Sequence, residues 1–419
     1  MVENKSEELE RSRITYETLE EHVRMKAQGF IQEILEEEVN HFLGRRKSER
    51  IKKGIDVPLG YRNGHGKPRK FALMNGTVTV ERPCIRNSEE KFVSRILPLF
   101  KRKSQELGNA LPELYLHGLS QGDFELALRG LLGKSAPLSK SSIQRLKGKW
   151  QLEYEEWKSR DLSDLEVVYQ WADGIYVKAG LEKEKAALLV IVGALSNGKK
   201  VFLACESGYR ESKESWLEVL RNLKKQGLKF PPLTVADGHL GIWSAFGELH
   251  PEGREQRCWN HKITNVLNAL PRKMREQAGE LLCKIPYADN LNESEKRRDQ
   301  FINRYQKGFP KATNKLLRDW DRMITFYSFP KEHWVHIRTT NVVESPFSST
   351  RLRTDAAKRF KKLESATAMI WKLLQVAEKN FRTLKGHWLL PDVLAGKKIA
   401  DGNLVDENKR EFKEERNAA

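Results

Sequence analysis

The chain has 419 residues, of which 75 are lysine or arginine and 57 are acidic, so its formal net charge is +18. This length predicts about three domains, and the charge predicts a nucleic-acid partner rather than a merely soluble basic protein. There is no apolar run near the ~18 residues of a membrane span, no apolar core after Met1 and only four scattered cysteines, so we expect a cytoplasmic protein with no membrane span, signal peptide or disulfide framework.

The N-terminal part is predicted to be a helix followed by a basic stretch and a hairpin. Apolar side chains recur every three or four positions between residues 13 and 45, which is typical of a helix. Residues 46–70 are basic and rich in turn residues, and we expect a loop that is ordered or becomes ordered on binding. Asn75-Gly76 between two short apolar runs predicts a hairpin over residues 71–82. The candidate DNA contacts of this part are Arg62, Lys67, Arg69 and Lys70.

Three short helices are predicted between residues 104 and 150, because apolar positions at helical spacing are twice interrupted by glycine-containing breaks. The third opens at Ser139 and is basic. Together with the net charge, this pattern favours a helix-turn-helix DNA-binding region over an ordinary three-helix packing unit. Its candidate DNA contacts are Lys140, Arg145 and Lys147.

In residues 165–260, apolar runs typical of strands appear between amphipathic helical segments, and this pattern predicts an α/β core. Apolar runs indicate strands and amphipathic spacing indicates helices, in the order strand-strand-strand-helix-strand-helix-strand. This is the order of a ribonuclease-H-like mixed sheet. The expected strands are residues 166–172, 187–195, 201–205, 233–236 and a short fifth at 256–259, and the expected helices are 213–225 and 240–249.

The rest of the chain is predicted to be an all-helical insertion, a second part of the core and a tail. The insertion separates the fourth strand from a later acidic residue, and a long helix over about 363–384 follows that residue. The last residues are charged with few apolar side chains, as in a disordered tail. The predicted divisions are 1–103 for the N-terminal helix, basic loop and hairpin, 104–160 for the helix-turn-helix-like region, 161–260 for the first part of the core, 261–335 for the insertion, 336–390 for the second part of the core, and 391–419 for the charged tail.

Three acidic residues are the candidate catalytic and metal-binding groups. Asp173 and Asp237 each end an apolar run, and Glu344 lies at a predicted helix start, where Asn341 and Glu344 resemble a capping box. Singly, each is more often structural, since Asp-Gly after a strand is usually a turn. Together, on this strand order in a basic chain, they fit the hard oxygen ligands that two Mg²⁺ or Mn²⁺ ions require for phosphodiester chemistry.

Two further groups of residues surround these acids in the sequence. Arg338, Arg351 and Arg353 lie near Glu344 among hydroxyl residues, and we expect them to hold DNA phosphates; a solvated, well-capped helix face is the alternative. Cys258 and His261 have the spacing of one of the two ligand pairs that a structural zinc site needs. With no second pair close by, packing or a hydrogen bond beside the core is favoured over structural zinc.

These motifs carry a family resemblance. The sequence resembles the mutator-type transposases of bacterial insertion sequences over about residues 55–390, although residues 1–54 and the tail match less clearly. The family's first acidic motif often has valine or leucine where this chain has Ala172, a mild departure. The matching segments are Gly60-Tyr61-Arg62-Asn63-Gly64, Tyr115-Leu116-His117-Gly118-Leu119-Ser120, Asp173-Gly174-Ile175-Tyr176-Val177, Asp237-Gly238, Cys258-Trp259-Asn260-His261, and Arg338-Thr339-Thr340-Asn341-x-x-Glu344-Ser345-x-Phe347-x-x-x-Arg351-x-Arg353-Thr354.

The resemblance implies a ribonuclease-H-like fold with an all-helical insertion before the third acid. It implies Asp173, Asp237 and Glu344 as a DDE triad, and Cys258 and His261 as the family's Cys-x-x-His pair. The implied activity is divalent-metal cleavage of double-stranded DNA at terminal inverted repeats and strand transfer to target DNA by a homo-oligomer at the nucleoid. The alternatives are a transposase-derived DNA-binding regulator without catalysis and a ribonuclease-H-like nuclease without strand transfer.

We predict that residues 1 to about 150 bind duplex DNA on their own and that this binding is strongly salt-dependent. Neutralising phosphates releases counterions, so a footprint of six to ten phosphate contacts loses about 10³- to 10⁵-fold in affinity between 50 and 200 mM salt. Fluorescence anisotropy with labelled duplex DNA at several salt concentrations measures this. A fragment that is folded but has no affinity at low salt would contradict the helix-turn-helix interpretation.

Overall fold

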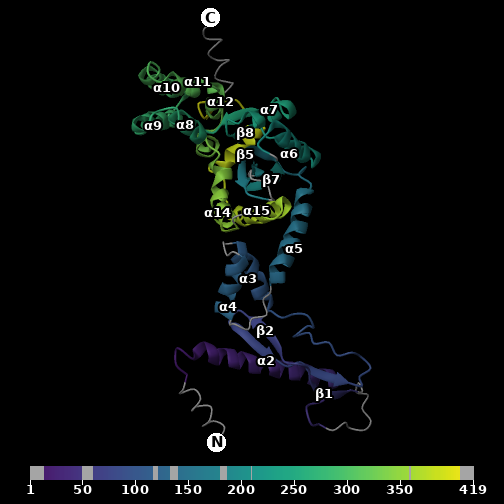
Figure 1. The fold of residues 1–419 in the computed structure, drawn as a ribbon. Coiled ribbons are helices and arrows are strands. Elements are labelled where there is room, and N and C mark those ends of the chain that lie inside the picture. The colour runs from purple at the N-terminus through teal and green to yellow at the C-terminus, as the bar shows by residue number, and fades with distance from the viewer. Residues whose placement is uncertain are drawn as a thin grey trace. The chain divides into compact units, whose positions relative to one another are not determined.

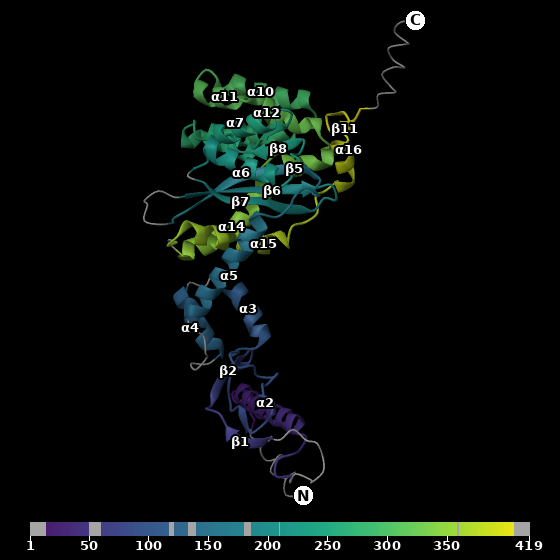
Figure 2. The same cartoon turned by 90° about the vertical axis from the view of Figure 1, so that its right-hand side faces the viewer.

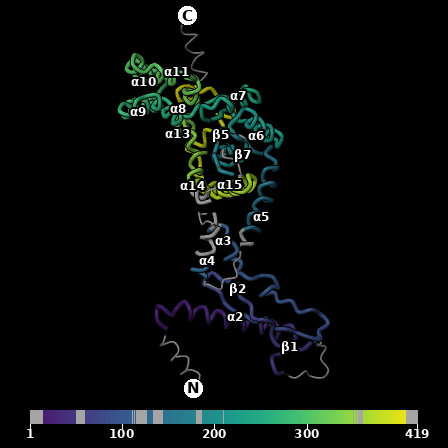
Figure 3. Tube along the Cα trace, viewed as in Figure 1, coloured from purple at the N-terminus to yellow at the C-terminus, as the bar shows by residue number. Residues whose placement is uncertain are grey.

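The computed structural model describes residues 14–49, 60–116, 121–132, 140–179, 186–208, 210–357 and 360–405. The chain divides into two compact units, Met1–Leu146 and Lys147–Ala419, and helix α5 (Lys140–Lys158) contains the boundary. Figures 1 and 3 trace the chain through both units. Within the described residues, none of the helices is long and apolar enough to cross a membrane.

The first unit begins with a long helix packed on a hairpin. Helix α2 (Leu19–Leu43) covers strands β2 (Arg69–Leu73) and β3 (Gly76–Val80), which pair antiparallel. This confirms the predicted hairpin, although its two-residue loop is one position earlier than expected, because Gly76 already pairs with Leu73. The unit's core is formed by Leu35, Val78, Val80 and Leu97.

Part of the expected basic loop is β-structure. Strand β1 (Tyr61–His65) pairs antiparallel with β4 (Pro83–Arg86), so the predicted loop over residues 46–70 is wrong for its last third, which also contains the start of β2. Residues 61–65 are polar and glycine-containing and do not alternate with apolar positions, so their strand depends on a partner about twenty residues away. Residues 50–59 lie outside the described part of the chain.

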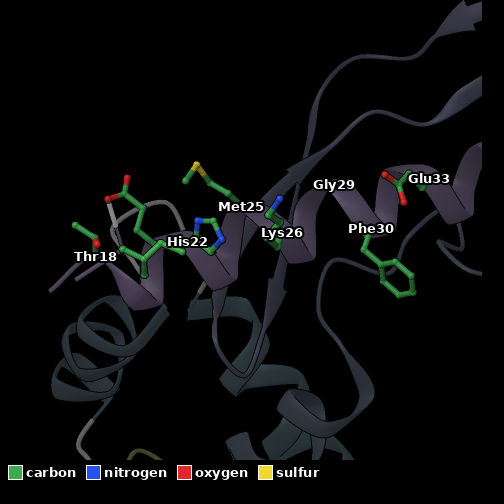
Figure 4. A pocket seen from close by; sticks show the side chains of 9 residues that line it. Thr18, His22, Met25, Lys26, Gly29, Phe30 and Glu33 are labelled. Carbon is green, nitrogen blue, oxygen red and sulfur yellow. The ribbon is translucent and has the colours of Figure 1, made fainter. Parts of the chain in front are cut away.

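Another face of α2 is open to solvent. Figure 4 shows side chains of Thr18, His22, Met25, Lys26 and Phe30 along a groove on this helix. Met25 and Phe30 are 61% and 62% exposed, so this face is not part of the unit's core.

Three helices follow at about the predicted positions, namely α3 (Gln105–Leu116), α4 (Gln121–Leu132) and α5. The Thr77 hydroxyl donates to the Leu132 carbonyl at 2.8 Å, which attaches α4 to the hairpin. Residues 117–120 and 133–139, where we predicted the breaks between helices, lie outside the described residues. Helix-turn-helix function in this region stays a prediction.

The second unit is built on a five-stranded mixed sheet. Its strands are β5 (Val167–Val177), β6 (Ala186–Leu195), β7 (Lys200–Gly208), β8 (Leu233–Ala236) and β9 (Arg254–Arg257), in the order β7-β6-β5-β8-β9. β5, β6 and β7 pair antiparallel, whereas β8 and β9 run parallel to β5. The chain order of these strands and the mixed character of the sheet are those that we predicted for a ribonuclease-H-like core.

Four of the five strands differ from their predicted bounds: β6 begins one residue earlier, β7 begins one residue earlier and ends three residues later, and β5 and β9 differ more clearly. β5 continues to Val177, because it pairs with β6 as far as Ala186. β9 begins and ends two residues earlier than the predicted fifth strand, because Trp259 already belongs to helix α8.

Helices cover both faces of this sheet (Figure 2). α6 (Lys213–Lys225) and α7 (Leu240–Leu249) lie on one face, and α14 (Asn341–Ala357) and α15 (Leu363–Glu378) lie on the other. The α6–α7 side buries Trp216, Leu220 and Phe246. α15 ends before the predicted residue 384, because the chain after Glu378 returns to the β6–β7 turn, where the Leu384 N–H donates to the Gly198 carbonyl at 2.9 Å.

The predicted insertion is entirely helical, as expected. The buried Lys262 ammonium donates to the carbonyls of Lys315 and Arg318, at 2.7 Å to the first, and so joins the first helix of the insertion to the end of a later one. The insertion consists of α8 (Trp259–Leu267), α9 (Arg275–Lys284), α10 (Leu291–Tyr305), α11 (Pro310–Leu317), α12 (Trp320–Ile324), α13 (Trp334–Ile337) and the 3₁₀ turns Arg272–Met274, Ile285–Tyr287, Thr325–Ser328 and Lys331–His333.

The expected charged tail from residue 391 is ordered over its first part. Helix α16 (Leu390–Leu394) is followed by a small hairpin of β10 (Ile399–Ala400) and β11 (Asn403–Leu404). This hairpin is held to the insertion, since the Lys331 N–H donates to the Gly402 carbonyl at 3.1 Å. Residues 406–419 lie outside the described residues.

Candidate active site

The sheet places the first two acids side by side. Ala172 of β5 and Ala236 of β8 form the last pair of the parallel ladder, so Asp173 and Asp237 follow at the same edge. Asp173 therefore lies within β5 where its partner β8 stops, rather than at the end of the strand as we expected. Each carboxylate accepts the N–H of the glycine that follows it, at 2.9 Å for Asp173.

Both of these glycines lie in close contact with a charged side chain. A Cβ on Gly174 would overlap the Glu211 carboxylate, and a Cβ on Gly238 would overlap the Arg257 guanidinium. Arg257 also forms a salt bridge with Asp319 of the insertion at 2.7 Å. The two Asp-Gly pairs are thus more than turns, because each lets a charged side chain approach the backbone beside an acid.

The third acid lies in the first turn of α14, where the helix dipole favours a carboxylate. The helix is capped one residue earlier than predicted: the N–H groups of Val343 and Glu344 donate to the Thr340 carbonyl, at 2.9 and 3.0 Å. The Asn341 side chain instead accepts a hydrogen bond from Asn260 of α8 at 2.9 Å. The predicted capping box at Asn341 is therefore wrong, and Thr340 takes the cap position.

The Cys-x-x-His pair lies between the second and third acids. The Cys258 N–H donates to the Ala236 carbonyl at 2.8 Å, and the next N–H, of Trp259, donates to the Arg338 carbonyl at 3.0 Å. One turn further, His261 Nδ1 is 3.8 Å from Asp237 Oδ1 and 3.8 Å from Glu344 Oε1. The start of α8 therefore brings the imidazole between two of the predicted catalytic acids.

Negative charge accumulates at this edge of the sheet. Burial raises the pKa of the Asp173 carboxyl to about 7, and the charges of Glu344 and Glu211 act in the same direction, against the Gly174 N–H and His261. Cys258, then Asp237 and Glu344, raise the pKa of His261 to about 9, against the effect of burial. The carboxylates and the imidazole thus interact electrostatically at this edge of the sheet.

Glu211 is a fourth acid that the sequence analysis missed. It precedes Ser212, the N-cap of α6, and nothing in its local sequence marks it. Its carboxylate lies against Gly174 and hydrogen-bonds the Tyr176 hydroxyl, whose pKa rises to about 12, chiefly through burial. Only the packing of the α6 start against β5 reveals it.

The ligand atoms of Cys258, His261 and Glu344 lie within 4.8 Å of one another. Among the described residues, these three potential metal ligands form the most compact group. The ligand atoms of the three predicted catalytic acids are farther apart from one another.

Three of the predicted DNA contacts are used inside the protein. The Arg338 guanidinium lies over the Tyr287 ring, 4.2 Å from its centroid, and donates to the Pro286 and Trp334 carbonyls. Arg62 forms a salt bridge with Glu36 at 2.7 Å, and Arg69 donates to the carbonyls of Pro98 and Lys101. These contacts account for the three arginines without DNA.

The remaining predicted DNA contacts differ in whether their side chains are exposed and free to bind a phosphate. Lys67, Lys70 and Arg351 are exposed, and the structure gives the Arg351 guanidinium no partner among the described residues. Arg145 and Lys147 have partners within the protein. The side chains of Lys140 and Arg353 lie outside the described part of the chain.

Residues 1–383 match the profile of the family described as "Transposase, Mutator family". The chain belongs to the mutator family of transposases. It is 41% identical over 300 residues to the transposase for insertion sequence element IS6120 of Mycolicibacterium smegmatis, covering 72% of this chain and 93% of that one. It is 40% identical over 278 residues to the transposase for IST2 of Acidithiobacillus ferrooxidans, covering 66% and 94%.

Solved structures resemble this transposase more distantly. The Drosophila P element transposase strand transfer complex is 12% identical, covers 73% of this chain and 85% of its own, and has a TM-score of 0.29. The HTLV-2 integrase catalytic core domain in complex with magnesium is 20% identical, covers 28% and 84%, and has a TM-score of 0.18. At these TM-scores, the fold assignment rests on the strand order and directions of this transposase itself.

We predict that Arg62 contributes to the stability of the protein, whereas Lys70 contributes to DNA affinity. Arg62→Ala removes the salt bridge to Glu36, which keeps its 2.7 Å contact with His65, and the hydrogen bond to Asn40, and should cost about 1 kcal/mol of stability, whereas Lys70→Ala should leave the melting temperature unchanged. If Lys70 contacts a phosphate, its loss should lower DNA affinity for all sequences and reduce the salt slope by about one. Thermal unfolding and DNA binding at several salt concentrations test both, and an Arg62→Ala protein of normal stability would contradict the structural role.

Proposed function

We propose that this transposase cleaves DNA and joins it to a target with Asp173, Asp237 and Glu344 as its catalytic residues. The observation that carries the proposal is their placement by three elements: the β5–β8 register aligns the two aspartates, and His261 lies 3.8 Å from both Asp237 and Glu344. Because Glu344 lies close enough to Asp173 to act on it, its charge adds to the effect of burial that raises the pKa of Asp173.

The donor set fits divalent cations. Carboxylate oxygens are the ligands that Mg²⁺ and Mn²⁺ prefer, and the His261 imidazole is a counter-charge shared by Asp237 and Glu344. Two such ions, when bound, activate an attacking oxygen and stabilise a leaving oxygen in phosphodiester chemistry. The glycine N–H groups that bond Asp173 and Asp237 fix one oxygen of each carboxylate, which orients the other.

The substrate that we propose is double-stranded DNA at the terminal inverted repeats of an insertion sequence. Water is the first nucleophile, and the freed 3′-hydroxyl then attacks target DNA at the same site, so no covalent protein–DNA intermediate is needed. The first unit, with the exposed Lys67 and Lys70, would hold the element ends. We propose a homo-oligomer, because two ends must be joined to one target.

We predict that Ala at Asp173, Asp237 or Glu344 abolishes cleavage and joining but spares DNA binding. Loss of a residue that only supports a metal ligand lowers metal affinity or activity by tenfold to about a hundredfold. Each of these acids is itself a proposed ligand of the metal ions, so its loss should lower activity further. The assay scores nicked and joined products on end-containing DNA with Mg²⁺. Appreciable cleavage by Asp237→Ala would sink the proposal, and cleavage without joining by the wild-type chain would indicate a nuclease instead.

A second prediction concerns Arg351. At ~100° per residue, a residue seven positions after Glu344 lies on nearly the same helix face, so a phosphate near the acids is within its reach. Arg351→Ala should lower strand transfer about tenfold or more, the value of one charged hydrogen bond, with little change in melting temperature. Arg353→Ala, on a different face, should be milder. Normal joining by a folded Arg351→Ala protein would contradict this role.

A further inference from the structure

One buried side chain connects the Cys-x-x-His pair to the third acid. Thr340 is fully buried, and its hydroxyl lies within hydrogen-bond distance of both Cys258 Sγ, at 3.1 Å, and Glu344 Oε1. Its backbone N–H also donates to Cys258 Sγ at 3.3 Å. Two segments that are far apart in the sequence, the start of α8 and the start of α14, thus meet at one hydroxyl.

The number of protons fixes the direction of these hydrogen bonds. A threonine hydroxyl has one proton and two lone pairs, so it can donate to only one of its two neighbours. The carboxylate is the stronger acceptor, because hydrogen bonds to ionised groups are roughly twice as strong as neutral ones. Thr340 therefore donates to Glu344, and its oxygen contacts the Cys258 sulfur, which also accepts the Thr340 N–H.

Both ends of this chain of hydrogen bonds are anchored. Cys258 is fully buried, and its N–H donates to the carbonyl of Ala236, the residue before Asp237. Thr340 is the cap of α14, where its carbonyl accepts the Glu344 N–H at 3.0 Å. The hydrogen bonds consequently link the strand end that carries the second acid to the helix that carries the third.

We propose that Cys258 and Thr340 are positioning residues that fix the carboxylate of Glu344 relative to Asp237. The inference rests on the proposed catalytic role of Glu344. The hydrogen bond holds Oε1, and among the described residues no hydrogen bond reaches Oε2, so the arrangement holds one oxygen and leaves the other for a metal ion. The buried Cys258 sulfur contacts both the N–H and the hydroxyl of Thr340, which favours a positioning role over a role as a metal ligand. Its distance from His261 and Glu344 would also allow metal binding.

The test measures Mn²⁺ affinity of the full chain by electron paramagnetic resonance titration, without any requirement for turnover. Thr340→Val removes the hydroxyl at nearly constant shape, and Cys258→Ala removes the sulfur; both should weaken Mn²⁺ binding about 10- to 100-fold, as for other indirect partners of metal ligands. Thr340→Ser keeps the hydroxyl and should bind Mn²⁺ like the wild type. The matched control is Thr367→Val, a buried helical threonine whose hydroxyl bonds only the Leu363 carbonyl at 3.0 Å, and it should change nothing.

The outcomes separate this inference from the proposed function. Wild-type Mn²⁺ binding by a folded Thr340→Val or Cys258→Ala chain, with binding lost in Glu344→Gln, would overturn the positioning role and leave the triad in place. Wild-type binding by Glu344→Gln would instead remove the proposed function on which the inference rests. Elemental analysis provides a further check: one zinc per chain in the wild type, lost in Cys258→Ala, would make the sulfur a ligand and overturn the hydrogen-bond assignment. If Thr340→Val does not fold, Cys258→Ala and Thr340→Ser carry the test.

Discussion

The parallel pairing of β5 with β8 is the constraint on which the rest of the site depends. Both strands are buried, and their ladder ends at the pair Ala172–Ala236. Because a shift of one residue in a strand turns every side chain to the opposite face, the packing on both buried faces favours the observed register. The two aspartates are therefore held by the whole sheet, and the third acid and His261 are fitted to a position that is already fixed.

Positive charge has two separate uses in this transposase. Several cationic side chains form contacts within the protein that involve the insertion. Arg257 forms a salt bridge with Asp319, Lys262 donates to two carbonyls at the end of α11, and Arg338 lies over the Tyr287 ring. Burial lowers the pKa of Lys262 to about 7, which is consistent with a lysine that serves as a hydrogen-bond donor to backbone. The net charge of +18 thus overstates how much of the surface is available for DNA.

The sequence predicts the core well where its patterns are local. Apolar runs and amphipathic spacing located α6, α7 and β8 with correct bounds, and two Asp-Gly pairs after apolar runs marked two of the acids. Contacts distant in sequence were not predictable in this way. β1 depends on β4, Glu211 matters because α6 packs on β5, and the internal role of Arg62 depends on Glu36 of α2. The cap of α14 was misplaced because Asn341 and Thr340 are both good capping residues, and only the packing of Asn260 against Asn341 distinguishes them.

The insertion begins and ends at the same place. Two successive amides, of Cys258 and Trp259, bond the end of β8 and the Arg338 carbonyl, so the chain leaves the core and re-enters it through one small junction. For a segment closed in this way, the entropy of loop closure grows only with the logarithm of length, by about 0.6 kcal/mol for each doubling. The closure cost of gaining or losing helices within the segment is consequently small, and evolution can reshape this lobe while the geometry of the acids stays the same.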